Sequence, residues 1–186
     1  FSGFDTIEEC YEELTPQVHA LETGLSSDPS MNRRLSALDS FHLISNSDAH
    51  SPAKLGREAN LFDIPMSYDG LYGAIQRGEG LAGTIEFFPE EGKYHFDGHR
   101  KCHLCLSPSQ ARQYNGICPV CGKKLTTGVL HRIEQLADRQ EDFILPGGRP
   151  YENLVPLPEV IAACMGSSSA SVKVTRQYEH MLEELG

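Results

Sequence analysis

The spacing of four cysteines constrains the fold of this chain more than any other sequence feature. Cys102 and Cys105 form one Cys-x-x-Cys pair, and Cys118 and Cys121 form a second pair in the sequence Cys-Pro-Val-Cys-Gly-Lys. Two such pairs can face each other across one tetrahedral Zn²⁺ with Zn–S bonds of about 2.3 Å. Gly122 permits a positive φ that turns backbone N–H groups toward the sulfurs. The sequence therefore predicts a zinc ribbon with these four cysteines as ligands.

Two alternatives to this four-cysteine ligand set stay open. His99 or His103 could replace one thiolate, because both lie beside the first pair. The four thiols could also form two disulfides or remain buried and free, although disulfides are rare in intracellular proteins. Cys10 and Cys164 are isolated, and we interpret them as small core residues.

Length and composition fit one domain, or a partial domain with appendages. The chain has 186 residues, of which 39% are hydrophobic, and this is enough for a good core. No apolar run approaches the roughly 20 residues that cross a bilayer, so we expect no membrane contact and a cytoplasmic location. Because the chain starts at Phe1 without a methionine, we expect it to be a fragment of a longer polypeptide.

Charge is segregated along the chain. The formal net charge is −10, which by itself argues against a nucleic-acid partner, because phosphate contacts need lysine and arginine. Residues 93–124, however, hold six basic side chains and one acidic side chain. Four thiolates on one Zn²⁺ contribute −2, so this stretch keeps a net charge of about +3 and predicts a local anion-binding face. The alternative is that a ribbon with little core simply carries a solvated charged surface.

The amino-terminal part has the pattern of a strand–helix–strand unit. A helix over 5–14 precedes a buried strand over 17–23. Ser27-Asp28-Pro29 then supplies a cap and a first-turn proline for a helix over 27–39. A second apolar strand spans 41–45. Such a unit is typical of a parallel α/β sheet, whose functional groups emerge at the carboxyl ends of its strands.

The residues that follow the second strand contain an Asp-x-His pair. Asp48 and His50 can direct a carboxylate oxygen and an imidazole nitrogen at one ion, a combination that suits Zn²⁺, Mn²⁺ or Fe²⁺. An Asp-x-His pair is a weak signal alone, because a capped loop with a surface histidine explains it better. We therefore treat the pair as a candidate metal site.

The carboxyl-terminal part has helical periodicity. Apolar residues recur at helical spacing over 127–139, 157–165 and 171–185, and a Pro/Gly-rich loop over 146–150 separates the first helix from the others. We expect these helices to pack together. Their apolar stripes could instead grip the minor groove of DNA, but such stripes are usually core.

Several stretches resemble one known family. The sequence Ser47-Asp48-Ala49-His50 is similar to the last metal-binding motif of the PHP (polymerase and histidinol phosphatase) superfamily. Residues 22–29, 55–60, 83–95 and 97–102 narrow the resemblance to the endonuclease Q-like family. The similarity extends over nearly the whole chain.

The resemblance implies an α/β fold in three parts. These are the carboxyl-terminal part of a PHP-type (β/α)7 barrel over 1–85, a zinc ribbon with four cysteine ligands over 86–125 and a small helical region over 126–186. It also implies an intracellular DNA-repair endonuclease that uses divalent metals (Zn²⁺, Mn²⁺, Fe²⁺ or Mg²⁺) to cut 5′ to uracil, hypoxanthine, xanthine or an abasic site.

The same resemblance limits what this chain can do alone. Asp48 and His50 match the catalytic metal site, but the His-x-His pair of the superfamily has no counterpart here. We therefore expect the remaining ligands in the missing amino-terminal half of the same polypeptide. Damaged DNA would be the partner of the whole protein, and this chain alone would be inactive.

The segment before the zinc ligands alternates cations with rings. Tyr94, His95 and Phe96 are candidates for contact with a displaced nucleotide, and the cations are candidates for contact with phosphates. Those cations are Lys93, Arg100 and Lys101. Equally, Tyr94 and Phe96 could pack the ribbon onto the barrel.

Four further residues have no settled role in the sequence. Asp97 and His99 could support the catalytic metal site, whereas Glu22 and Glu86 are at least as well explained as structural carboxylates.

Two other functions fit the same residues. The chain could be a zinc-ribbon module that binds nucleic acid or protein on a non-catalytic PHP-like remnant. It could also belong to a PHP phosphoesterase that acts on a small molecule.

Overall fold

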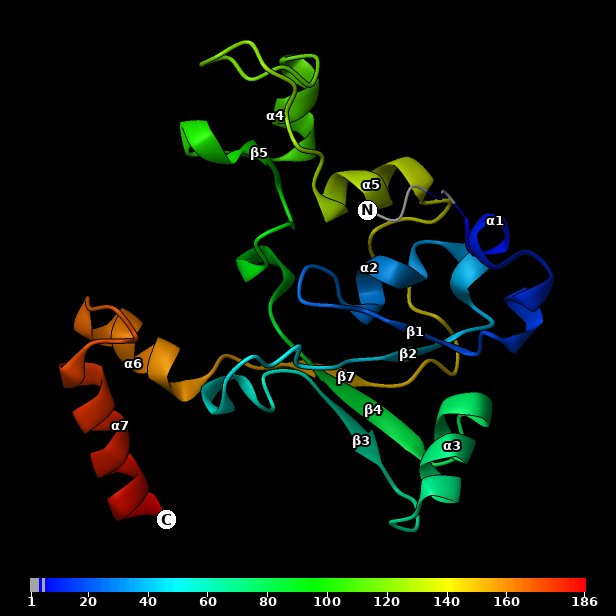
Figure 1. Ribbon diagram of the computed structural model, residues 1–186, viewed down its shortest axis with the longest axis horizontal. Helices are drawn as coiled ribbons and strands as arrows, with labels where there is room; N and C mark the ends of the chain where they lie inside the picture. The colour runs from blue at the N-terminus through cyan, green and yellow to red at the C-terminus, as the bar shows by residue number, and fades with distance from the viewer. Residues whose placement is uncertain (1–3, 5) are drawn as a thin grey trace. The chain divides into compact units, whose positions relative to one another are not determined.

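The computed structural model describes residue 4 and residues 6–186, and it has a mixed α/β architecture (Figure 1). The α-helices are α1 (Ile7–Tyr11), α2 (Pro29–Arg33), α3 (Tyr68–Arg77), α4 (Pro108–Gln113), α5 (Val129–Leu136), α6 (Leu157–Met165) and α7 (Val172–Leu185). The strands are β1 (Ala20–Glu22), β2 (His42–Ile44), β3 (Ala59–Phe62), β4 (Leu81–Glu86), β5 (Asp97–His99), β6 (Leu104–Leu106) and β7 (Tyr151–Asn153). Short 3-10 turns are η1 (Glu12–Gln17), η2 (Ser36–Leu38), η3 (Pro52–Lys54), η4 (Pro89–Glu91) and η5 (Arg100–Cys102).

The predicted strand–helix–strand unit is present at β1, α2 and β2. Strands β1 and β2 are parallel, with Leu21 paired with Leu43. Asp28 caps α2 by accepting a hydrogen bond from the Met31 N–H at 2.8 Å, as the sequence predicts. Asp5, where the first predicted helix begins, lies outside the described residues.

Helix α2 is shorter than the predicted span of 27–39. It ends at Arg33, and a separate turn, η2, begins at Ser36. The break has a long-range cause that local periodicity does not contain. Asp138 accepts a hydrogen bond from the Ser36 N–H at 2.9 Å and so caps η2 from a distant part of the chain.

The second sheet has the order β3-β4-β7, and α3 lies at one end of the β3–β4 pair (Figure 1). Strands β3 and β4 are antiparallel, with an irregularity between Leu61 and Phe62. Ser67 caps α3 through the Gly70 N–H, and Gly78 ends the helix with a left-handed φ of 71°. The predicted strand–helix–strand unit ends at residue 45 and did not cover this antiparallel sheet.

The described residues do not form a closed barrel by themselves. Their strands make a two-stranded sheet of β1 and β2, the β3-β4-β7 sheet and a two-stranded sheet of β5 and β6. Closing a barrel requires every strand to pair on both sides, and these three separate sheets keep open edges. The described residues thus have a mixed α/β architecture, and the expectation that they are the carboxyl-terminal part of a barrel stays a prediction.

The ribbon is built on the antiparallel pair β5–β6. Its small core contains Leu106, Ala111, Cys118 and Leu125. Ser107 and Gln110 form a reciprocal capping box at the start of α4, which fixes the helix after β6.

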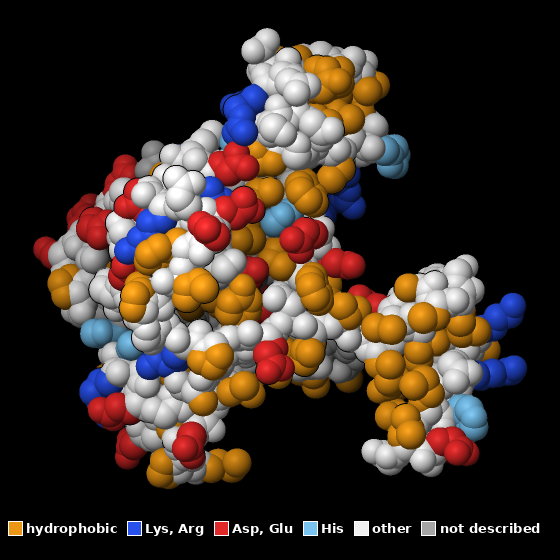
Figure 2. Space-filling model, turned by 180° about the vertical axis from the view of Figure 1, so that it is seen from behind, with side chains coloured by type: hydrophobic (Ala, Val, Ile, Leu, Met, Phe, Trp, Pro, Cys, Tyr) orange, Lys and Arg blue, Asp and Glu red, His pale blue; other side chains and the backbone are white. Residues whose placement is uncertain are grey.

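The chain divides into two compact units, residues 1–152 and 153–186. Helix α5 belongs to the first unit, and α6 and α7 belong to the second. The predicted domain boundaries at 85/86 and 125/126 stay a prediction. Helices α6 and α7 pack through Ile161, Ala162 and Val174. Figure 2 shows that this second unit also carries many hydrophobic side chains on its surface.

Two smaller findings concern single residues and membrane contact. Cys10 and Cys164 are exposed, so their interpretation as core residues was wrong. Among the described residues, no helix has the length and apolar character that a membrane span requires.

Candidate functional site

A Cys/His cluster lies in the ribbon at the predicted position of the zinc. Its ligand atoms belong to His99, Cys102, Cys118 and Cys121 and all lie within 4.8 Å of one another. Ligands of a tetrahedral Zn²⁺ with bonds of about 2.3 Å lie roughly 3.8 Å apart. The cluster therefore fits a structural metal such as zinc in both donor type and spacing.

The turn that carries the second cysteine pair has the predicted geometry. Gly122 has a φ of 71°, and its N–H donates to the Cys118 carbonyl at 2.8 Å. Burial raises the pKa of the Cys118 thiol, but the N–H groups of Cys121 and Val120 outweigh burial and lower that pKa overall. Backbone donors that favour a thiolate also favour metal ligation.

The fourth position of the cluster is held by His99 instead of Cys105. Cys105 is exposed, and it faces Gly98 across the β5–β6 ladder, whereas His99 faces Leu104. Alternation along a strand therefore puts His99 on the face of Leu104, beside the Cys118 core, and turns Cys105 to the other face. All six cysteines are free thiols in the structure, which removes the disulfide alternative.

Asp48 and His50 lie together in the loop after β2. The Asp48 Oδ1 and His50 Nε2 atoms are 3.6 Å apart, and the two side chains are 68% and 91% exposed. Asp48 has a positive φ of 44°, an uncommon conformation for a non-glycine residue. Both groups are accessible to a shared ion, although the metal-ligating cluster found among the described residues does not include them.

Two residues that sequence reasoning missed hold this loop in place. The Arg57 Nε–H donates to the Ser47 carbonyl at 2.8 Å. The Asn60 amide accepts from the Ser45 N–H at 2.9 Å and donates to the Ser45 carbonyl at 2.7 Å. Both lie in the stretch 55–60, which carries part of the family resemblance. That resemblance was the only sequence signal for their role.

Two buried carboxylates lie close to strand ends: Glu86 is the last residue of β4, and Glu58 directly precedes β3. Glu86 is fully buried and accepts hydrogen bonds from Thr23 at 2.8 Å and from Thr84 at 2.5 Å, so it is a structural carboxylate. Glu58 is 3% exposed, and burial followed by repulsion from Glu86 raises its pKa to about 7. Sequence reasoning missed Glu58, because nothing local marks a glutamate as buried.

Four of the six predicted DNA contacts line one cavity of about 550 Å³ beside the ribbon, which we name the ribbon cavity. They are Lys93, Tyr94, Phe96 and Arg100. The Lys93 ammonium lies 5.0 Å from the centre of the Tyr94 ring. Lys101 is exposed but does not line this cavity. Cations and rings thus occur together here, as a site for a phosphate and a base requires.

His95 and Asp97 instead connect the ribbon to α5. His95 is 3% exposed and its Nδ1 lies 3.0 Å from the Ser26 carbonyl, so its ring points into the interior and away from a DNA surface. Asp97 accepts from the Gly128 N–H at 2.6 Å and pairs with His131 at 2.6 Å. The carbonyls of Tyr94 and His95 accept the next two N–H groups of α5.

The fold and the site together define the class of protein to which this chain belongs. The chain is a mixed α/β protein with a Cys/His cluster in the ribbon, an exposed Asp/His pair after a parallel strand, and a cavity lined by rings and by both basic and acidic side chains. No protein-family model matches it.

Two solved structures match nearly the whole chain. One is the lesion-specific endonuclease PfuEndoQ from Pyrococcus furiosus, with a TM-score of 0.81 and 31% identity over 98% of this chain and 46% of that chain. The other is endonuclease Q in complex with a 27-mer duplex substrate that has an abasic lesion at the active site. It has a TM-score of 0.85 and 31% identity over 99% of this chain and 47% of that chain.

Curated relatives are also longer than this chain. It is 33% identical over 195 residues to the uncharacterized protein MJ0043 of Methanocaldococcus jannaschii, covering 100% of this chain and 24% of that protein. It is 31% identical over 144 residues to the uncharacterized protein YqxK of Bacillus subtilis, covering 75% of this chain and 35% of that protein. The chain thus spans about half of the solved structures that it matches. The predicted resemblance to endonuclease Q is confirmed in fold and sequence.

Proposed function

We propose that this chain is part of a metal-dependent DNA-repair endonuclease that hydrolyses the phosphodiester 5′ to a damaged nucleotide. The observation that carries the proposal is the likeness to endonuclease Q, which extends over 98% and 99% of the chain. The proposed lesions are uracil, hypoxanthine, xanthine and abasic sites. One of the matched structures holds a duplex with an abasic lesion, which supports the last of these.

Asp48 and His50 are the proposed metal ligands that this chain contributes to the catalytic centre. Their exposure and their separation of 3.6 Å allow both to bind one ion. Divalent metals at such a centre supply an activated water and neutralise phosphoryl oxygens. The other ligands, and the strands that would complete a PHP-type barrel around β1 and β2, are proposed to lie in the parent polypeptide outside this chain. The chain alone would then be inactive.

The ribbon is proposed to hold the DNA beside that centre. A structural Zn²⁺ bound by the Cys/His cluster would fix β5, β6 and the turn at 118–122 relative to one another. Lys93 and Arg100 would then contact phosphates in the ribbon cavity, while Tyr94 and Phe96 would stack on a displaced nucleotide. Lys101 would contact a phosphate outside the cavity.

A second candidate is a zinc-ribbon module that binds nucleic acid without cutting. The observation that favours it is that the cluster of potential metal ligands found in the described part of the chain does not include the exposed Asp48/His50 pair. A small-molecule phosphoesterase is less well supported, because such an enzyme has no need of the excess of basic side chains in residues 93–124.

An incision assay with the parent polypeptide separates these candidates. Labelled duplexes with uracil, hypoxanthine, xanthine or an abasic site, and an undamaged duplex, are incubated with Mg²⁺ or Mn²⁺. We expect cuts mapped to the 5′ side of each lesion and an intact undamaged strand. Binding without incision would support the module, and equal cutting of damaged and undamaged strands would remove lesion specificity.

A further inference from the structure

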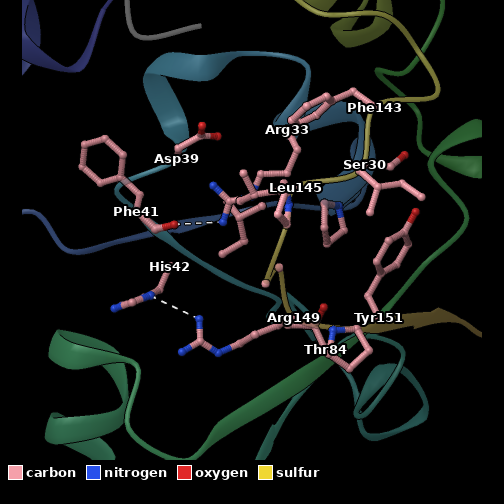
Figure 3. A pocket seen from close by; sticks show the side chains of 17 residues that line it. Ser30, Arg33, Asp39, Phe41, His42, Thr84, Phe143, Leu145, Arg149 and Tyr151 are labelled. Carbon is pink, nitrogen blue, oxygen red and sulfur yellow. Dashed lines mark hydrogen bonds between the residues drawn. The ribbon is translucent and has the colours of Figure 1, made fainter.

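A second cavity lies at the start of β2, where the segment 143–151 passes in front of it (Figure 3). It has a volume of about 780 Å³, and we name it the arginine cavity. Its lining includes Arg33, His42, Phe143, Leu145, Arg149 and Tyr151. Asp48 and His50 follow the other end of β2 and do not line it. The proposed catalytic pair therefore does not account for this cavity.

Two arginines of the cavity bind neutral partners. Arg33 donates to the carbonyls of Leu38 at 2.5 Å and Phe41 at 3.0 Å. Arg149 donates to the carbonyls of Leu81 at 2.5 Å and Gly78 at 2.7 Å. Carbonyl oxygens orient a guanidinium without cancelling its charge, and a guanidinium has five N–H donors in a fixed fork. Both groups therefore keep donors and positive charge for an anion.

The one carboxylate among the described lining residues is already neutralised. Asp39 forms a two-point ion pair with Arg139, with N–O distances of 2.8 Å and 2.5 Å. Burial lowers the pKa of Arg33; the Asp39 carboxylate is the next largest influence and opposes this shift, and the charges of Arg139 and Arg149 add to the lowering. The cavity is thus short of negative charge, and a bound anion would stabilise Arg33.

Arg149 is held in place by close packing. Gly78 has a φ of 71°, and a Cβ built on it would lie 2.2 Å from the Arg149 side chain and 2.7 Å from the His42 ring. Glycine is therefore required for the guanidinium to reach this position. The Pro150 carbonyl also accepts from the Thr84 N–H at 3.3 Å, which attaches the segment to β4. A preorganised donor avoids the cost of ordering upon binding.

The remaining lining suits an uncharged body attached to the anion. Phe143, Leu145 and Tyr151 supply apolar and aromatic surface, and the Arg139 guanidinium lies 4.1 Å from the Phe143 ring centre. A volume of this size exceeds what a lone phosphate fills and lies within the range of small-molecule sites, roughly 300–1,000 Å³. We propose that the arginine cavity binds a small phosphate monoester with a planar body, of the size of a nucleoside monophosphate.

Direct titration of the parent polypeptide tests this proposal. The probes are adenosine 5′-monophosphate and deoxyuridine 5′-monophosphate, with the matching nucleosides and inorganic phosphate as comparison arms. We expect the mononucleotides to bind more tightly than nucleoside or phosphate alone. The proposal fails if neither mononucleotide binds at millimolar concentration, or if a nucleoside or inorganic phosphate binds more tightly than both mononucleotides.

Variants and a spectroscopic signal locate the site. Arg149→Gln should weaken binding by about tenfold or more, because it removes a charge-assisted contact. Arg176→Gln, at an exposed position on α7, is the matched control and should leave affinity unchanged. In the unsubstituted protein the mononucleotide should shift the NMR signals of the His42 ring, which lies 3.4 Å from Arg149. Unshifted His42 signals, or equal affinity in both variants, would overturn the assignment even if Arg149→Gln folds poorly.

Discussion

At the scale of single residues, burial decides what each ionisable group can do. Glu86 is buried and hydrogen-bonded to two threonines, whereas Glu58 keeps a buried oxygen, Oε2, with no hydrogen-bond partner. Burial of a carboxylate without compensating hydrogen bonds favours the neutral acid. Both residues are glutamates near strand ends, so their sequence neighbourhood could not separate their roles.

The raised pKa of Glu58 predicts a pH-dependent stability. Its pKa rises from 4.5 to about 7, so the folded state holds a proton that the unfolded state releases between these values. The free energy of unfolding should therefore fall as the pH rises from about 4.5 to 7, by an amount on the order of 3 kcal/mol. Glu58→Gln should remove this part of the slope. Burial also raises the pKa of Glu86, which leaves a slope of the same sign. Urea unfolding at pH 4.5 and 8 measures it, and a variant with the original slope would contradict the account.

The zinc ligand set can also be tested one residue at a time. Because the cluster contains His99 and Cys118 but not Cys105, His99→Ala and Cys118→Ser should lose zinc. Cys105→Ser should retain about one equivalent of zinc. Elemental analysis of the purified proteins measures the content. Loss of zinc from Cys105→Ser with retention in His99→Ala would restore the four-cysteine set expected from spacing alone.

At the scale of elements, hydrogen bonds connect the ribbon to the start of α5. Asp97 binds the Gly128 N–H at the start of α5 and the His131 ring in its first turns. Gly128 has no space for a side chain, because a Cβ there would lie 2.4 Å from the His95 carbonyl oxygen. The segment before the zinc cluster is thus the cap of a helix as well as a candidate DNA contact.

This connection predicts unequal costs for two acidic residues. Asp97→Ala leaves a buried N–H and a partly buried imidazole without their partner, and should cost about 1–3 kcal/mol of unfolding free energy. Glu134→Ala removes only a surface ion pair with Arg112 and should cost less than about 1 kcal/mol. Denaturant unfolding compares the two variants, and equal losses would show that Asp97 does not hold α5.

The cations near the cluster predict a salt-dependent effect on DNA binding. Arg100→Ala combined with Lys101→Ala should weaken binding by the parent polypeptide and reduce the slope of log K against log salt by about 2, one for each lost phosphate contact. Lys173→Ala on α7 is the control for loss of an exposed charge. An unchanged slope in the double variant would assign both cations to solvent.

Sequence reasoning succeeded where structure is local and failed where it depends on distant partners. The Asp28 cap, the parallel pair β1–β2 and the Gly122 turn all follow from adjacent residues. The early end of α2 and the choice of His99 over Cys105 do not. The first depends on Asp138, and the second depends on which strand face meets the Cys118 core. Arg57 and Asn60 support the loop after β2. Only the family resemblance of residues 55–60 pointed to them in the sequence.

At the scale of the whole molecule, the ribbon cluster and the proposed catalytic pair differ in how many metal ligands they offer. The cluster of His99, Cys102, Cys118 and Cys121 has the donors of a structural zinc site, whereas Asp48 and His50 offer two accessible ligands. A likeness to endonuclease Q that covers about half of the solved chains fits this asymmetry. The proposed activity is therefore to be measured on the proposed parent polypeptide.

The most direct test of the central claim is single-turnover incision by the parent polypeptide and its Asp48→Ala and His50→Ala variants. The substrate is a duplex with one abasic site or uracil, and binding to the same duplex is measured in parallel. Loss of the proposed metal ligands should reduce incision by at least about a hundredfold while binding changes little, because the proposed DNA contacts lie elsewhere. Incision at the original rate in both variants would contradict the assignment of this loop to the catalytic centre.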